Sequence, residues 1–390
     1  MTQSRFTRAI TETTGEYPEG SPFCPVYQTT TFTFASAAEM ESVVSGEQAG
    51  ALYTRYGSNP SIKAVEKALA GLEDAPAALV FSAGMAAIAS TLLALGREGI
   101  VAVGELYGGT QGLLENQIPA LGIPVHWVDR GDEPALADAL SEPGRLVYCE
   151  SPTNPTLSLI DLQALATTTH AADALLAVDN TFATPCNQQP LALGADLALH
   201  SATKYLGGHS DITAGAVMGP EPLVQQINPW RINLGQLISP DTAALLSRSL
   251  RTLPLRMERH NQNAEHIAHA MRNTPGIRRV FYPGLNGTDD AVLAQSQMHG
   301  GGGMVTIEVD GDRQAAASVA DQLRLFRLAP SLGGVESLVS QPCATSHHGL
   351  TPEQREARGI TDSMLRLSVG LEDPEDLTAD LQRALHGYRS

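Results

Sequence analysis

Short apolar runs alternate with helical patterns between residues 78 and 218. Six runs of four or five mostly apolar residues are typical of strands covered on both faces. They are Ala78–Phe81, Ile100–Val103, Leu146–Cys149, Ala174–Val178, Ala195–Leu199 and Ala214–Met218. Helical patterns, such as Met85–Leu95 and Asp161–Ala171, fall between several of them. The pattern predicts a doubly wound α/β domain with a mostly parallel sheet, whose ligands gather at the carboxyl ends of the strands.

The flanking segments predict two further parts. Residues 1–50 are rich in Thr, Ser, Pro and Gly, which favours an extended arm that contacts a neighbouring subunit. Asn59 and Pro60 begin a helix as N-cap and first helical residue. A long helix over 240–272, bent near Pro254, leads to a smaller α+β domain. We expect the arm over 1–50, a large domain over 51–245 and a C-terminal domain over 246–390, with strands at Met304–Val309 and Leu365–Val369 and a closing helix at Glu375–His386.

Composition narrows the class of protein. The 390 residues are 43% apolar and 17% charged, which excludes a disordered chain. The net charge of −17 argues against nucleic acid or an anionic membrane as a partner. Four scattered cysteines show no metal-ligand spacing, and the N-terminus lacks a signal-peptide core, so we expect a cytoplasmic protein without a metal site. The apolar stretch Ala75–Leu95 is interrupted by a turn, which favours strand, turn and helix over a membrane span.

Lysine is rare in this chain, which makes each one informative. Lys63 and Lys67 lie four residues apart on the first predicted helix, as ordinary surface lysines do. Lys204 instead follows a buried strand, between hydroxyl residues and glycines. It is either a loop lysine that reaches solvent or the amine that forms a Schiff base with a phosphate-bearing aldehyde, pyridoxal 5′-phosphate.

Other residues at predicted strand ends suit the same cofactor. Asp179 could pair with a protonated pyridine nitrogen or simply cap a helix. Tyr107 offers a ring for stacking and a phenol for proton transfer, although a Tyr-Gly pair also makes a plain turn. Gly84 and Met85 sit where a strand turns into a helix, which favours a phosphate or merely a tight turn.

Two arginines and several histidines complete the candidates. Arg55 suits a phosphate contact but is equally consistent with an exposed loop. Arg366 lies in an apolar strand pattern, so it either points outward from an edge strand or is buried against a carboxylate, such as that of an amino-acid substrate. We assign no chemistry to His200 and His209, or to the loop pair His347 and His348.

Eight segments in order resemble the trans-sulfuration family of pyridoxal-phosphate enzymes, over essentially the whole chain. They are Tyr53-Thr54-Arg55 with Asn59-Pro60, Ser82-Ala83-Gly84-Met85, Leu106-Tyr107-Gly108-Gly109-Thr110, Glu150-Ser151-Pro152-Thr153-Asn154-Pro155, Val178-Asp179-Asn180-Thr181, Ser201-Ala202-Thr203-Lys204-Tyr205, Ser331-Leu332-Gly333-Gly334 with Glu336-Ser337-Leu338, and Arg366 to Asp373. The family includes cystathionine γ-synthase, cystathionine γ-lyase and methionine γ-lyase. The resemblance implies the fold of aspartate-aminotransferase-like (fold type I) enzymes.

The resemblance also implies a role for each site residue. Lys204 would form the internal aldimine, Asp179 would pair with the pyridine nitrogen, and Tyr107 would stack on the ring and serve as a proton donor. The phosphate would be held by Gly84, Met85, Ser201 and Thr203, and by Tyr53 and Arg55 from the adjacent subunit of a dimer or tetramer. The substrate carboxylate would be bound by Asn154, Ser331 and Arg366.

Departures from the family pattern bear on the substrate. Cystathionine-processing members tend to have a glutamate where this chain has Pro330, and methionine γ-lyases tend to have a cysteine where it has Gly109. Methionine γ-lyases also carry a Lys-Asp pair near the position of Arg231 and Ile232. We expect Pro330, Ile232 and Leu234 to make the side-chain pocket apolar, which favours γ-elimination from a small, methionine-like amino acid.

Three alternatives stay open from the sequence. The first is a specialised natural-product enzyme that expels a γ-halide or another group from an unusual amino acid. The second is a cystathionine γ-lyase or γ-synthase. The third, from another class of protein, is an inactive cofactor-binding regulator, although the lysine, aspartate, tyrosine and both arginines are all present.

Overall fold

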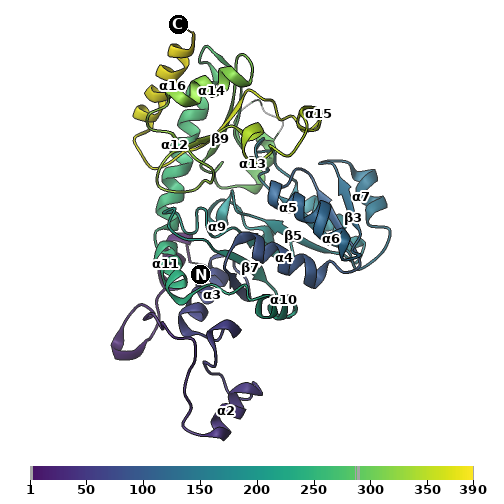
Figure 1. Ribbon diagram of the computed structural model, residues 1–390, viewed down its shortest axis with the longest axis vertical. Coiled ribbons are helices and arrows are strands. Elements are labelled where there is room, and N and C mark those ends of the chain that lie inside the picture. The colour runs from purple at the N-terminus through teal and green to yellow at the C-terminus, as the bar shows by residue number, and fades with distance from the viewer. Residues whose placement is uncertain (1–2, 286, 288–289, 390) are drawn as a thin grey trace.

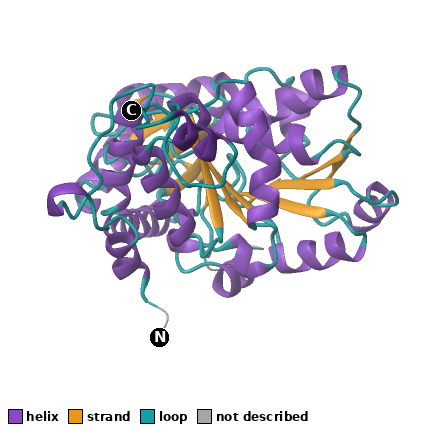
Figure 2. Cartoon of the chain, turned by 90° about the horizontal axis from the view of Figure 1, so that it is seen from below, coloured by secondary structure: helices purple, strands orange, loops and turns teal. Residues whose placement is uncertain are grey.

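The computed structural model describes residues 3–285, 287 and 290–389, and it contains two sheets. The predicted arm begins at residue 1 and the predicted C-terminal domain ends at residue 390, and both of these end residues lie outside the described range. The two sheets are covered by helices, and the N-terminal segment projects from the lower end of the molecule (Figure 1). A view from below shows the strands enclosed between helices (Figure 2). No helix within the described residues has the length and apolar character needed to cross a membrane.

The larger sheet has seven strands, and all of them except β7 run parallel to one another. In spatial order they are β1 (Ala77–Phe81), β7 (Gly215–Gly219), β6 (Leu197–His200), β5 (Leu175–Asp179), β4 (Leu146–Glu150), β2 (Ile100–Val103) and β3 (Val125–Val128). Six correspond to the predicted runs, and the mostly parallel α/β fold is confirmed. The edge strand β3 was not predicted, because its sequence Val-His-Trp-Val is only partly apolar and Trp127 is exposed.

Helices flank this sheet and begin largely where local sequence signals place them. They are α3 (Pro60–Leu72), α4 (Gly84–Leu95), α5 (Gly108–Gly112), α6 (Ile118–Ala120), α7 (Glu133–Ala139), α8 (Leu162–Ala171), α9 (Thr184–Asn187), α10 (Glu221–Asn233) and α11 (Pro240–Leu250). Asn59 caps α3 by accepting a hydrogen bond from the Ser61 amide at 2.9 Å. Asp161 caps α8 in the same way through the Ala164 amide. Two of the loops contain further single-turn helical segments, η2 (Thr54–Tyr56) and η4 (Pro190–Leu193), and η3 (Leu113–Gln117) joins α5 directly to α6.

The C-terminal part is built on the second, mostly antiparallel sheet. Its strands, in spatial order, are β10 (Arg327–Leu328), β11 (Leu338–Ser340), β12 (Met364–Ser368), β9 (Met304–Val309) and β8 (Ile277–Phe281). Its helical segments are α12 (Leu253–Arg272), α13 (Ala291–Gln297), α14 (Arg313–Gln322), η5 (Pro342–Ala344), α15 (Pro352–Glu356) and α16 (Pro374–Arg389). The predicted strands at β9 and β12 and the closing helix α16 are all present.

The long predicted helix is two helices, with the break three residues before Pro254. The first, α11, packs against α3 of the large domain. The second, α12, contributes Met257 to the core of the large domain and Ala264 to the core of the C-terminal part. A domain boundary at 245/246 stays a prediction, and α12 belongs to both cores.

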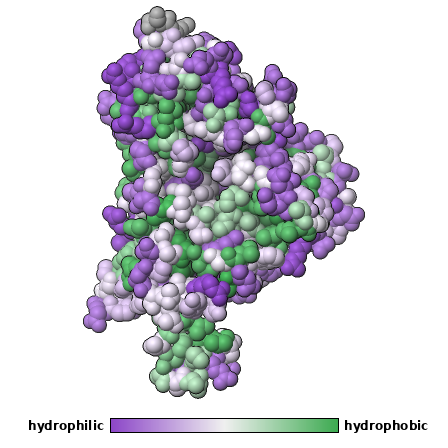
Figure 3. All heavy atoms as spheres, in the orientation of Figure 1, coloured by the Kyte–Doolittle hydropathy of each residue, from purple (hydrophilic) through white to green (hydrophobic). Residues whose placement is uncertain are grey.

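The predicted arm is partly helical rather than wholly extended. Helix α1 (Arg5–Thr11) packs against α3 and α12 of its own chain, and a turn η1 (Pro18–Gly20) follows. The next segment projects from the body and carries helix α2 (Ala37–Val44) at its tip (Figure 1). Apolar residues gather at this tip, and Val26, Met40 and Val44 are exposed in the single chain (Figure 3).

A buried ion pair joins α10 to α3 and β1. The Arg231 side chain is inaccessible to solvent and donates to the Glu66 carboxylate, to the Val80 carbonyl oxygen at 3.0 Å and to Asn228 Oδ1. Glu66 also binds Lys63, whose side chain is more than half exposed. Because the guanidinium satisfies three acceptors in the interior, it fixes the position of α10 on the sheet.

We expect Arg231→Met to lower the free energy of unfolding by about 3 kcal/mol, because Glu66 would stay buried with Lys63 as its remaining cationic partner and the Val80 amide as a donor. Arg248→Met, on the exposed side of α11, should change it by less than about 0.5 kcal/mol. Urea unfolding followed by circular dichroism measures both. Equal losses for the two variants would contradict this role for Arg231.

Candidate active site

A pocket of about 740 Å³ lies at the carboxyl ends of β4, β5 and β6. Strand ends and the following loops supply one side of its lining, with Glu150, Asp179 and Lys204 among them. The C-terminal part supplies the other side through Pro330, Ser331 and Arg366. Of the residues predicted from sequence, the structure brings together Gly84, Met85, Tyr107, Asn154, Asp179, Ser201, Thr203, Lys204, Ser331 and Arg366.

Lys204 points its amine at the C-terminal part of the chain. Its Nζ donates a hydrogen bond to Ser331 Oγ at 2.8 Å. Burial, together with the positive charge of Arg366, lowers the pKa of Lys204 to about 8. A lysine whose amine is readily neutral can attack a carbonyl carbon, which is the property that a Schiff-base lysine needs.

Asp179 ends β5 and is only 9% exposed. Its carboxylate accepts hydrogen bonds from the Thr181 amide at 2.9 Å and from the Tyr148 hydroxyl at 3.4 Å. Burial raises its pKa, and hydrogen bonds from Thr181 oppose the shift. No lysine, arginine or histidine of the described chain forms an ion pair with it. The site therefore has room for a cationic partner such as a protonated pyridine nitrogen.

The first turn of α4 has features that suit a phosphate group. No side chain caps this helix, because Ala83 occupies the N-cap position. A Cβ atom at Gly84 would lie 2.8 Å from Ser201 Cβ, so only glycine allows this close approach. Ser201 and Thr203 line the same part of the pocket. Uncapped amides, a helix dipole and two hydroxyls suit a phosphate group.

Arg366 is buried on β12, an interior strand of the second sheet, and is only 7% exposed. Its guanidinium donates to Asn154 Oδ1 at 3.0 Å and to the Ser331 carbonyl oxygen at 3.2 Å. Ser331 has a φ of 88°, a backbone conformation that costs energy for a residue with a side chain. Both acceptors of Arg366 are neutral, so the carboxylate expected beside this arginine is left for a ligand to supply.

Tyr53 and Arg55 lie apart from this pocket. Both are exposed at η2, where the Arg55 guanidinium lies 4.8 Å from the Tyr56 ring centroid and donates to the Ile232 carbonyl oxygen. Ile232 and Leu234 lie at the end of α10 and are not among the residues that line the pocket of the same chain. The expectation that they line the side-chain pocket is therefore not met within one subunit, whereas Pro330 does line it.

Some pocket residues carried no functional prediction from the sequence. Glu150 was part of a recognised motif but had no role, and its place beside Asp179 follows from the register of β4 and β5. His348 lies in a loop as expected, yet it lines the pocket. His200 is buried and binds Glu73 at 2.6 Å, in keeping with a structural hydrogen bond.

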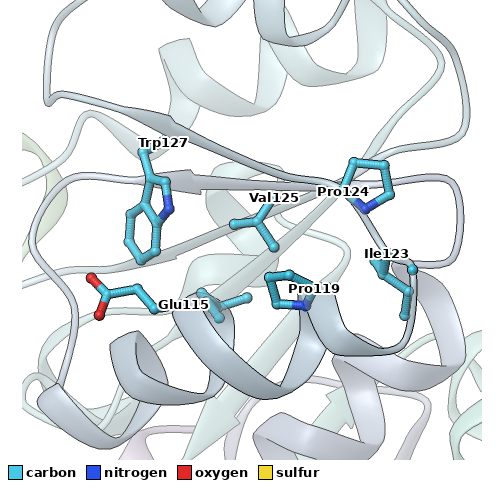
Figure 4. Close-up of a pocket in the computed structure, with 8 residues that line it drawn as sticks. Glu115, Pro119, Ile123, Pro124, Val125 and Trp127 are labelled. Atoms are coloured by element: carbon cyan, nitrogen blue, oxygen red, sulfur yellow. The ribbon is translucent and has the colours of Figure 1, made fainter.

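A second pocket, of about 480 Å³, lies on the surface beside the edge strand β3. Figure 4 shows Trp127 and Val125 of β3 above the helical segment that carries Glu115 and Pro119. Glu115 is the sole ionisable residue of its lining, so this pocket offers no acid–base pair. Within the described ranges, no group of three or more metal-ligating side chains occurs either.

The fold and the main pocket together fit a pyridoxal-phosphate enzyme of the α/β type, with Asp179 and Lys204 following the adjacent strands β5 and β6 and the uncapped first turn of α4 lying against Ser201. Comparison with known proteins agrees. Residues 7–386 match the family described as Cys/Met metabolism PLP-dependent enzyme. The chain belongs to this family, and its cofactor is pyridoxal 5′-phosphate.

Individual relatives extend over nearly the whole chain. L-methionine gamma-lyase of Pseudomonas putida is 43% identical over 365 residues, which is 93% of this chain and 92% of the relative. Cystathionine gamma-synthase 1 of Nicotiana tabacum is 40% identical over 93% of this chain and 67% of the relative. The crystal structure of cystathionine gamma synthase from Xanthomonas oryzae pv. oryzae superposes with a TM-score of 0.93 at 36% identity, covering 100% of this chain and 99% of that one.

We expect Gly84→Ala to raise the dissociation constant for pyridoxal 5′-phosphate at least about ten-fold, or about 1.4 kcal/mol. The new methyl group would collide with Ser201 where the phosphate should lie. Gly112→Ala is the matched control, because a Cβ there meets nothing within 4 Å and its φ is −58°. Absorbance titration of the cofactor-free protein measures both constants. An unchanged value for Gly84→Ala would contradict a phosphate site at the first turn of α4.

The rate of cofactor uptake should report the low pKa of Lys204. Only the neutral amine attacks an aldehyde, so the uptake rate should rise with pH through about 8 and then level off, instead of rising towards the ordinary lysine value of 10.5. Arg366→Met should move the midpoint to higher pH, because it removes one cause of the lowered pKa. Arg248→Met should leave it in place. Stopped-flow absorbance gives these profiles, and identical midpoints in all three proteins would exclude the effect of Arg366.

Proposed function

We propose that this enzyme eliminates the γ-substituent of a small, largely apolar L-amino acid, with a methionine-like thioether as the first candidate. The observation that carries the proposal is the meeting of Lys204 and Arg366 at Ser331, one at the side-chain oxygen and the other at the backbone oxygen. Ser331 thereby holds Lys204, the proposed base, close to Arg366, the proposed carboxylate-binding group. The 43% identity to a methionine gamma-lyase supports the choice of substrate.

The described pocket suits pyridoxal 5′-phosphate in a defined orientation. Lys204 would hold its aldehyde carbon, Asp179 its pyridine nitrogen and Tyr107 its ring face. The phosphate would be bound by Gly84, Met85, Ser201 and Thr203. When bound, this cofactor withdraws electrons from the Cα and Cβ atoms of an attached amino acid and so makes their protons acidic.

Arg366 and Asn154 would bind the α-carboxylate of the substrate and so place Cα near the Lys204 amine. Lys204 would then accept the Cα proton, because its low pKa leaves the amine able to act as a base near neutral pH. Lys204 would pass this proton on to the bound cofactor and, neutral again, would accept a second proton from Cβ. The bond between Cγ and sulfur would then break, and its electron pair would leave with the sulfur. Tyr107 would supply a proton to that sulfur from its phenol.

The far side of the pocket favours an uncharged substituent. Pro330, Leu332 and Ala344 of the C-terminal part line the pocket together with Thr345, Ser346 and His348, none of which is acidic. Family members that process cystathionine tend to have a glutamate at the position of Pro330. With no acidic side chain there, the distal ammonium group of cystathionine would lose a partner. This supports a small thioether over cystathionine.

Two other substrate classes are alternatives. Cystathionine is the first, since cystathionine gamma-synthase of Nicotiana tabacum is 40% identical to this chain. An amino acid with a γ-halide is the second, because the apolar lining would accept a chlorine as readily as a methylthio group.

The active enzyme would be a homodimer with shared sites, or a tetramer of two dimers, in the cytoplasm. Tyr53 and Arg55 lie outside their own pocket and would complete the phosphate site of the adjacent subunit. The exposed apolar side chains Val26, Met40 and Val44 on the projecting segment support such a contact.

A panel of substrates tests the proposal. We expect kcat/KM for release of a 2-oxo acid and ammonia to be at least about ten-fold higher with methionine than with cystathionine, O-acylhomoserines or γ-chloro amino acids. Lys204→Ala should bind the cofactor but lose turnover by at least about a thousand-fold. A preference for cystathionine would refute the reading of Pro330, and an active Lys204→Ala enzyme would refute the mechanism.

A further inference from the structure

Two carboxyl groups end adjacent strands in the pocket. Glu150 closes β4 and Asp179 closes β5, and the two residues are direct partners in the register of this parallel pair. Both line the pocket, and they are 6% and 9% exposed. Two ionised carboxylates held side by side away from water would repel each other, so one of them should retain a proton.

The surroundings select which carboxyl group is ionised. Asp179 accepts two hydrogen bonds, from the Thr181 amide and the Tyr148 hydroxyl, and both favour the charged form. The ionisable groups that interact electrostatically with Glu150 include Asp179, Tyr148 and Cys149, and none of these three is a cation at neutral pH. Burial and the charge of Asp179 together raise the pKa of Glu150 well above its usual value.

Glu150 also holds the backbone of Tyr107. The Tyr107 amide donates to Glu150 Oε1 at 2.8 Å, immediately before α5 begins. On the other side, a Cβ at Gly108 would lie only 2.5 Å from the Ser346 carbonyl oxygen, so the turn is enclosed by the loop of the C-terminal part. Tyr107 as a whole is 47% exposed, and it lines the pocket. The orientation of the Tyr107 side chain therefore depends on its backbone, which is held by Glu150 and enclosed by the loop at Ser346.

We propose that Glu150 is a positioning residue that acts as a neutral carboxylic acid: one oxygen fixes the Tyr107 backbone, and the retained proton leaves Asp179 as the ionised member of the pair. This inference rests on the proposed function, in which Tyr107 protonates the leaving atom. An amide would replace the neutral acid well, because it keeps the acceptor oxygen and carries no charge. An apolar residue would not, because the Tyr107 amide would lose its acceptor.

The first test compares the same chemical change at two paired positions in the cofactor-loaded enzyme. At neutral pH, the infrared spectrum should contain the carbonyl stretch of a protonated carboxylic acid. This band should disappear in Glu150→Gln and persist in Asp179→Asn, because burial, the larger cause of the raised pKa of Glu150, remains in that variant. A wild-type spectrum without a band that Glu150→Gln removes would overturn the proposal, and this readout does not depend on turnover.

The second test measures whether the amide rescues the loss. We expect Glu150→Gln to lower kcat by no more than about three-fold and Glu150→Leu to lower it by about ten- to a hundred-fold, because a buried amide would be left unpaired. Thermal unfolding of both variants checks their folding. If Glu150→Leu does not fold, the presence or absence of the infrared band in Glu150→Gln still tests the proposal. Equal losses of kcat in two folded variants would overturn the proposal.

Failure here is distinguishable from failure of the proposed function. If Lys204→Ala retains turnover, the mechanism itself is wrong, whatever the state of Glu150. If Lys204→Ala is inactive while Glu150→Gln is as impaired as Asp179→Asn, the mechanism stands and Glu150 must be an essential anion.

Discussion

Two cationic groups meet in one pocket without an anion between them, and the organisation of the site depends on this arrangement. Lys204 and Arg366 come from different parts of the chain and both contact Ser331. Burial lowers the pKa of both groups, and the charge of Arg366 lowers that of Lys204 further, so the lysine amine is easily neutral while the arginine has no balancing carboxylate. A substrate carboxylate supplies the missing charge. Cofactor and substrate are therefore recognised locally, in spite of the net charge of −17.

Strand register is what brings the two acidic residues into the same pocket as these cations. Parallel strands bring their carboxyl ends to one edge, so Glu150, Asp179 and the residues after His200 reach the pocket from three neighbouring strands. The same geometry that gathers useful groups also forces two carboxyl groups together. Hydrogen bonds from Thr181 and Tyr148 stabilise the ionised form of Asp179 and do not reach Glu150, so the two carboxyl groups differ in how readily they ionise.

The large domain and most of the pocket could be predicted from sequence, because apolar strand runs and strand-end residues are local signals. Edge strand β3 could not, since its exposed Trp127 breaks the apolar pattern. The helices of the arm begin at Ser4 and Ser36, whose N-cap signals are short and easily read as loop. The role of Glu150 depends on the register with Asp179, and the position of Ile232 depends on how α10 packs, so neither is readable from spacing along the chain.

Helix α12 spans both halves of the molecule, with Met257 in one core and Ala264 and Ile267 in the other. Cutting the chain anywhere within it would leave apolar side chains of each half in water. The two halves therefore cannot be treated as modules that evolution or an engineer exchanges freely between family members. A chimaera would have to inherit α12 together with the interior surfaces on both of its sides.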